Sequence, residues 1–226
     1  GVEQTTYMLN NIPLVRPTVV DSCILIMHDY SHFVTCDPKE IDAERGVIIE
    51  ERRTRRNASW RMYEKSKPYL YGDSKYAGCS LIGSQENLET FKPESLTNFY
   101  HTWYRPDLQA LIVVGDIDVN YVEAAIKRIF SDIPAPVNPK AKDVIKIPDN
   151  EAPSIGVITD PEAVSTSVEV YWKSAAMPEE FNSTMQGELT GLLKSLISSI
   201  MNERLSDIAA KADAPFSSAG FGIGNM

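Results

Sequence analysis

A charged stretch that starts at residue 37 constrains the fold most, because it carries a complete helix start signal. Asp37 suits the N-cap, Pro38 the first helical position and Glu40 the capping-box position. The next strong breaker is Pro68, and Gly46 is the one weak point between them. The pattern therefore predicts one long helix that ends just before Pro68.

The rest of the chain mixes helical and strand-like patterns. Apolar residues at helical spacing predict further helices over residues 15–33, 93–105, 119–130 and 181–211. Short apolar or alternating runs are typical of strands, and they occur at residues 2–10, 108–114, 154–159, 164–172 and 216–223. This mixture predicts an α+β architecture.

Charge and hydropathy exclude some classes of partner. The formal net charge of -9 disfavours a nucleic-acid partner, because binding a phosphate backbone relies on a basic surface. The one basic cluster, Arg52, Arg53, Arg55 and Arg56, is expected to be a solvated helix face, with contact to an acidic partner as the alternative. No apolar run reaches the roughly 18 residues that a membrane span needs, and no signal peptide is visible. The compartment is left open.

Three cysteines, Cys23, Cys36 and Cys79, are widely spaced along the chain. An odd number without a paired C-x-x-C argues against a disulfide framework and against a zinc ribbon.

Two glutamates, Glu44 and Glu51, stand seven residues apart in the predicted long helix, in the pattern E-R-x-V-x-x-x-E. Seven residues make nearly two turns, so the carboxylates share a face but stand about 10 Å apart along the axis. They cannot both bind one ion. One can act as a metal ligand while the other orients the site, although on spacing alone a surface pair is the plainer interpretation.

The stretch ERGVIIEE, residues 44–51, resembles a segment of the pitrilysin/insulinase family of zinc metallopeptidases. In that family an inverted zinc motif, H-x-x-E-H, is followed further along the chain by a glutamate ligand. Three more stretches resemble family landmarks in the right order: LIGSQENL (81–88), FYHTWYRPDLQALIVVGDID (99–118) and NERLSDI (202–208). The resemblance covers nearly the whole chain. The family that it points to is related to mitochondrial processing peptidase.

This resemblance implies that Glu51 is a zinc ligand and that Glu44 is an acid that orients the site without binding the metal itself. The other zinc ligands and the general base would lie outside this chain, which begins at Gly1 without an initiator methionine and is expected to be a piece of a longer protein. The intact parent would use zinc to hydrolyse peptide bonds in oligopeptides or unfolded segments. This piece alone is expected to be inactive and to hold no zinc tightly.

The resemblance also implies a domain layout, in which long helices pack on mostly antiparallel sheets. Five prolines between residues 132 and 153 mark the boundary. Residues 1–136 would be the C-terminal part of the zinc-site domain, 137–150 a linker, and 151–226 the N-terminal part of a non-catalytic domain, so that both are truncated. The partners would be peptide substrate and the rest of the parent chain or a homologous subunit. The alternative function is a non-catalytic structural or peptide-binding subunit.

Two further groups of residues invite a functional interpretation. His28 and His32 sit at i, i+4 and imitate a zinc motif, but Ser31 occupies the base position and cannot serve as that base. We expect both histidines, and His101, to be helix surface or the edge of the core. Three tyrosines in the connection after the long helix are expected to pack, with peptide contact as the alternative; they are Tyr69, Tyr71 and Tyr76.

Overall fold

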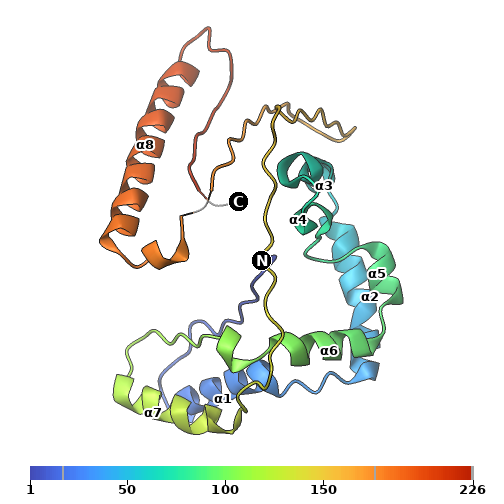
Figure 1. The fold of residues 1–226 in the computed structure, drawn as a ribbon, viewed down its shortest axis with the longest axis vertical. Helices are drawn as coiled ribbons and strands as arrows, with labels where there is room; N and C mark the ends of the chain where they lie inside the picture. Colours follow the sequence, from blue (N-terminus) through green and yellow to red (C-terminus); the bar gives the residue numbers. More distant parts are fainter. Residues whose placement is uncertain (17, 176, 225–226) are drawn as a thin grey trace. The chain divides into compact units, whose positions relative to one another are not determined.

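Helices make up the regular secondary structure of the residues that this computed structural model describes, which are 1–16, 18–175 and 177–224 (Figure 1). The chain divides into a first unit, Gly1–Val168, and a second unit, Glu169–Met226. The first unit contains α1 (Thr18–His32), α2 (Pro38–Arg55), α3 (Ala58–Tyr71), α4 (Lys75–Gly78), α5 (Gln85–Thr90), α6 (Pro93–Trp103), η1 (Pro106–Leu108), α7 (Val119–Ile129) and η2 (Phe130–Asp132). The second contains η3 (Glu179–Phe181) and α8 (Met185–Ala209).

The core of the first unit lies between α1 and α7. Ile24 from α1 and Val122 and Ala125 from α7 are buried together. The α7 start is fixed by Asp118, whose carboxylate accepts a hydrogen bond from the Tyr121 amide at 3.1 Å. The predicted helices at 15–33 and 119–130 are confirmed, because both carry an apolar stripe that this core buries.

The long helix predicted from Pro38 onward is broken into α2 and α3. Asn57 stands between them, and its side chain accepts a hydrogen bond from the Trp60 amide at 2.9 Å, which makes it the N-cap of a new helix. Pro68 does not end α3, which runs on to Tyr71. Gly72 ends it with a φ of 55°, a conformation that a glycine adopts without strain.

The predicted α+β class, with long helices on mostly antiparallel sheets, is wrong for this structure: no described residue lies in a strand. The segments predicted as strands run as irregular chain, drawn as thin tubes in Figure 1. At residues 110–115, for example, no backbone–backbone hydrogen bond forms within the described chain, and the Ile112 and Val114 side chains are 82% and 91% exposed. An alternating pattern describes one segment, whereas a strand also requires a neighbour to complete its ladder of hydrogen bonds.

The second unit is built on α8. Thr184 caps its start by accepting a hydrogen bond from the Gly187 amide at 3.2 Å. Farther along, the Asn202 side chain bonds both the N–H and the C=O of Phe221, at 2.8 and 3.0 Å, and so ties the segment after the helix back to it. The assignment of residues 1–136, 137–150 and 151–226 to two domains and a linker stays a prediction.

Candidate functional site

The candidate site is the face of α2 that carries Glu44 and Glu51. The helix starts as predicted: the Asp37 carboxylate accepts a hydrogen bond from the Lys39 amide at 2.8 Å, and Pro38 occupies the first turn. Both glutamates lie within α2, well before its end at Arg55. Nearly two turns separate them, so they project from the same side of the helix, about 10 Å apart along its axis.

The two carboxylates differ in their surroundings. Glu51 is half-buried and forms an ion pair with Arg55, one turn later, at 2.6 Å. Glu44 is exposed, and within the described chain its carboxylate has no hydrogen-bond or ion-pair partner. An i, i+4 ion pair of this kind contributes only about 0.3–0.5 kcal/mol. A metal cation could therefore replace Arg55 at Glu51 at little cost.

Two arginines that directly follow these glutamates hold α2 against α5. Arg45 donates to the carbonyl oxygens of Leu88, at 2.5 Å, and Phe91, at 3.0 Å. Arg52 donates from Nε to the carbonyl oxygen of Gly83 at 3.2 Å. The prediction of a solvated face was wrong for Arg52, which is half-buried. The sequence held a signal for these contacts: a Glu-Arg pair occurs twice, seven residues apart, so Arg45 and Arg52 lie on one side of α2.

The rest of the basic cluster behaves as predicted. Arg53 is exposed and pairs with Glu50, one turn earlier, at 2.6 Å. That bond raises the pKa of Arg53 and lowers the pKa of Glu50, since each charge favours the other. Arg55 is likewise exposed. Neither arginine reaches another helix, so this part of the cluster is a solvated face.

His28 and His32 do not form a metal site. The His28 ring is buried, with Nδ1 lying 3.0 Å from Asp29 Oδ1 and Nε2 lying 2.8 Å from Asp132 Oδ1. Both ring nitrogens are therefore engaged. The His32 Nδ1 atom instead lies 3.5 Å from the backbone oxygen of Tyr104. Across the described residues, no group of three or more His, Cys, Asp and Glu side chains could hold a metal ion.

The three tyrosines predicted to lie in a connection are helical instead: Tyr69 and Tyr71 belong to α3 and Tyr76 to α4. They make contacts within the first unit. The Tyr71 and Tyr76 rings lie 6.0 Å apart, and the Tyr76 hydroxyl donates to the Glu3 carboxylate. This bond lowers the pKa of Glu3, with a second contribution from Lys142. The Tyr69 ring packs against Gly156. His101 is an exposed residue of α6. These contacts agree with the packing role predicted for the tyrosines.

A model of the peptidase M16 inactive domain matches residues 90–222, more than half of the chain. The chain belongs to the peptidase M16 family. The resemblance to pitrilysin and insulinase peptidases is thereby confirmed. Glu44 and Glu51 lie before the first matched residue of the M16 inactive domain, on α2.

Relatives of this M16 chain are named as zinc proteases. It is 34% identical over 133 residues to the "Probable zinc protease PqqL" of Escherichia coli (strain K12), which covers 59% of the chain and 14% of that protein. It is 27% identical over 215 residues to the "Zinc protease PQQL-like" of Arabidopsis thaliana, which covers 95% of the chain and 22% of that protein. The chain thus spans less than a quarter of the length of these relatives.

A solved structure shares the fold of the M16 chain. It is the crystal structure of the first half of the periplasmic protease PqqL from Escherichia coli, with a TM-score of 0.68 and 24% identity, over 92% of this chain and 44% of that one. At this identity the likeness shows the fold alone. In the part of the chain that the structure describes, no helix combines the length and the apolar character needed to cross a membrane.

Proposed function

We propose that this chain is part of a zinc metallopeptidase that hydrolyses peptide bonds, and that Glu51 supplies one of its zinc ligands. The observation that supports Glu51 is its setting on α2. The helix start is fixed by the Asp37 cap, and the side chain is held by nothing stronger than the Arg55 ion pair. A carboxylate on a rigid helix, with a partner that is readily replaced, is suited to binding a cation.

The donor set of the described chain fits part of a catalytic zinc site. Such a site takes three protein ligands and leaves one position open. Glu51 offers one carboxylate, and the remaining ligands and the general base would come from other residues of the parent protein. When bound, zinc would polarise the carbonyl of the substrate peptide bond and lower the pKa of a bound water to about 7. Glu51 would hold the ion by its carboxylate oxygen.

Glu44 has a separate role in this proposal. At about 10 Å from Glu51 along the helix it cannot share the ion, but its carboxylate has no partner in the described chain and is free to accept a hydrogen bond from a residue that binds zinc. Acceptors of this kind fix the orientation of a ligand and raise its basicity. Glu44 would therefore tune the site rather than bind the metal.

The substrate would be a peptide or an unfolded protein segment, and the partner would be the rest of the parent chain or a homologous subunit. The second candidate is a non-catalytic subunit of the same family. The match of residues 90–222 to the inactive domain favours this role for most of the chain, whereas Glu44 and Glu51 lie outside the matched range and favour the peptidase.

The test is Glu51→Gln in the full-length parent protein, with bound zinc measured per mole by mass spectrometry. Because a neutral amide is a poor zinc donor, the variant should lose its zinc and its peptide hydrolysis. Glu50→Gln is the matched control, since Glu50 is an exposed neighbour that pairs only with Arg53 in the described chain. Retention of full zinc by Glu51→Gln would show that the ligand assignment is wrong.

A further inference from the structure

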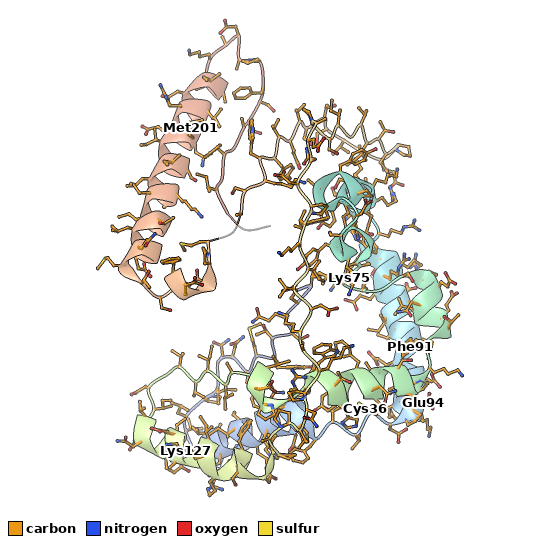
Figure 2. All side chains as sticks on the ribbon, viewed as in Figure 1. Cys36, Lys75, Phe91, Glu94, Lys127 and Met201 are labelled. Carbon is orange, nitrogen blue, oxygen red and sulfur yellow. The ribbon has the colours of Figure 1, made fainter. Side chains whose placement is uncertain are left out.

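The Arg45 side chain binds the C-terminal end of α5. It is 17% exposed, and its guanidinium donates to the carbonyl oxygens of Leu88 and Phe91. The last carbonyls of a helix have no partner within the helix and carry its negative dipole end, so a cation that bonds two of them is well placed. The guanidinium also lies 4.1 Å from the centre of the Phe91 ring, which Figure 2 labels.

Arg52 binds the other end of α5, one heptad farther along α2. Its Nε donates to the carbonyl oxygen of Gly83 at 3.2 Å, and its Nη1 donates to the side chain of Gln85 at 3.4 Å. The α5 helix has six residues, too few to be stable alone in water. Its place alongside α2 in Figure 1 is therefore set by two arginines, one at each end.

These contacts fix the rotation of α2 about its own axis. Each arginine follows a glutamate directly, Arg45 after Glu44 and Arg52 after Glu51, and one residue of a helix is a turn of about 100°. The α5 helix thus lies about 100° around α2 from the face of the two glutamates, and neither arginine covers a carboxylate. Two attachments along the length of α2 resist rolling in a way that one cannot.

Rolling matters because zinc coordination tolerates little displacement. With side chains a helix has a radius of about 5–6 Å, so a roll of about 20° would move a carboxylate at its surface by about 2 Å. Zinc–oxygen distances are about 2.0–2.2 Å and vary by only about 0.2 Å. A small loss of rotational control would therefore break the bond.

We propose that Arg45 and Arg52 are positioning residues, which aim Glu51 at the zinc ion by clamping α2 to α5. This role depends on the function proposed above for Glu51. It assigns the two arginines of the E-R pattern to a task different from that of the two glutamates. It also gives α5, which belongs to no group of three or more potential metal ligands among the described residues, a part in the site.

The experiment compares Arg45→Gln, Arg52→Gln and Arg53→Gln in the full-length parent protein. Zinc affinity is measured by competition with a chelator, and hydrogen exchange reports on the α5 amides. Arg53 is the matched control, since it lies on the same helix, is exposed and pairs only with Glu50 in the described chain. Loss of either positioning arginine should speed α5 exchange and weaken zinc binding about tenfold, as loss of an orienting partner does. Arg53→Gln should change neither.

Arg45→Lys separates positioning from charge. Lysine keeps the charge but has no planar fork to bridge two carbonyls, so it should restore only part of the zinc affinity. If Arg45→Gln fails to fold, Arg52→Gln carries the test by itself. Faster α5 exchange with zinc affinity equal to that of Arg53→Gln would overturn the positioning role. An unchanged amount of bound zinc per mole of the Glu51→Gln variant would instead overturn the proposed function, whatever the hydrogen-exchange data show.

Discussion

His28 and Asp132 meet across 104 residues of sequence, with the ring Nε2 atom 2.8 Å from the carboxylate oxygen. The other ring nitrogen faces Asp29 at 3.0 Å. A neutral imidazole has one N–H and can satisfy only one of these carboxylates, whereas the protonated ring donates to both. When the ring is protonated, the His28–Asp132 hydrogen bond therefore links the last part of α1 to η2. This bond lies next to the α1–α7 core.

The first prediction is that this link makes stability depend on pH. Burial lowers the pKa of His28, but its hydrogen bonds with Asp132 and Asp29 outweigh that effect and raise the pKa above its ordinary value of about 6.5. A raised folded-state pKa means that the contribution is complete below about pH 6.5 and is lost as pH rises through the folded-state value. The titratable groups that bond the His28 ring are Asp29, on α1, and Asp132, on η2.

The measurement is the thermal midpoint of the chain at about pH 6 and pH 8.5, with the His28 pKa followed by NMR. His28→Gln should lower stability by about 1.5–3 kcal/mol at pH 6, the range for hydrogen bonds to charged groups, and by less at pH 8.5. His101→Gln, an exposed histidine, is the control. A His28 pKa at or below about 6.5 would refute the protonated link.

The second prediction uses two glycines of α8 as a matched pair. At Gly187 an added Cβ would lie 2.1 Å from the backbone oxygen of Phe181, so Gly187→Ala should destabilise the start of the helix by about 1–3 kcal/mol. At Gly191 nothing lies within 4 Å of that position. Gly191→Ala should therefore stabilise the helix by up to about 1 kcal/mol, the difference in helix propensity.

Urea unfolding of both variants, followed by circular dichroism, measures the two changes. The opposite signs are the test, because a general effect of alanine on α8 would move both midpoints the same way. A stabilising Gly187→Ala would mean that the approach of Phe181 to the helix start is not maintained in solution.

Local signals predicted the helices well. Asp37 with Pro38 marks a start that the structure confirms, and the apolar stripe over residues 119–130 predicted α7, because caps and periodicity act within a few residues. The break at Asn57 was not predicted, because an asparagine inside a helical pattern lowers helix stability only slightly unless its side chain bonds the backbone. That bond to Trp60 is visible only in the structure.

Relationships between distant segments could not be predicted. The strand patterns were recognised, but no sequence pattern states whether an extended run will find a neighbour, and the described residues form no sheet. The same limit applies to the candidate site. Arg45 reaches Leu88 and Phe91 across 43 and 46 residues, and those acceptors are backbone carbonyls, which every residue carries. The identity of an acceptor residue therefore gives no hint of the contact.

The last prediction separates Glu44 from Glu51 in the parent protein. If Glu51 binds zinc and Glu44 only orients a ligand, Glu44→Gln should keep at least part of its zinc while the rate of peptide hydrolysis falls about 10–100-fold. The reason is that an amide can still accept a hydrogen bond but carries no charge to strengthen the ligand behind it. Zinc per mole and turnover are measured at saturating zinc for Glu44→Gln, Glu51→Gln and the control Glu50→Gln. Equal loss of zinc in the Glu44 and Glu51 variants would contradict the division of roles, since it would mean that both carboxylates are needed to hold the ion. Normal turnover in Glu44→Gln would instead leave Glu44 as an exposed residue of α2 with no part in the site.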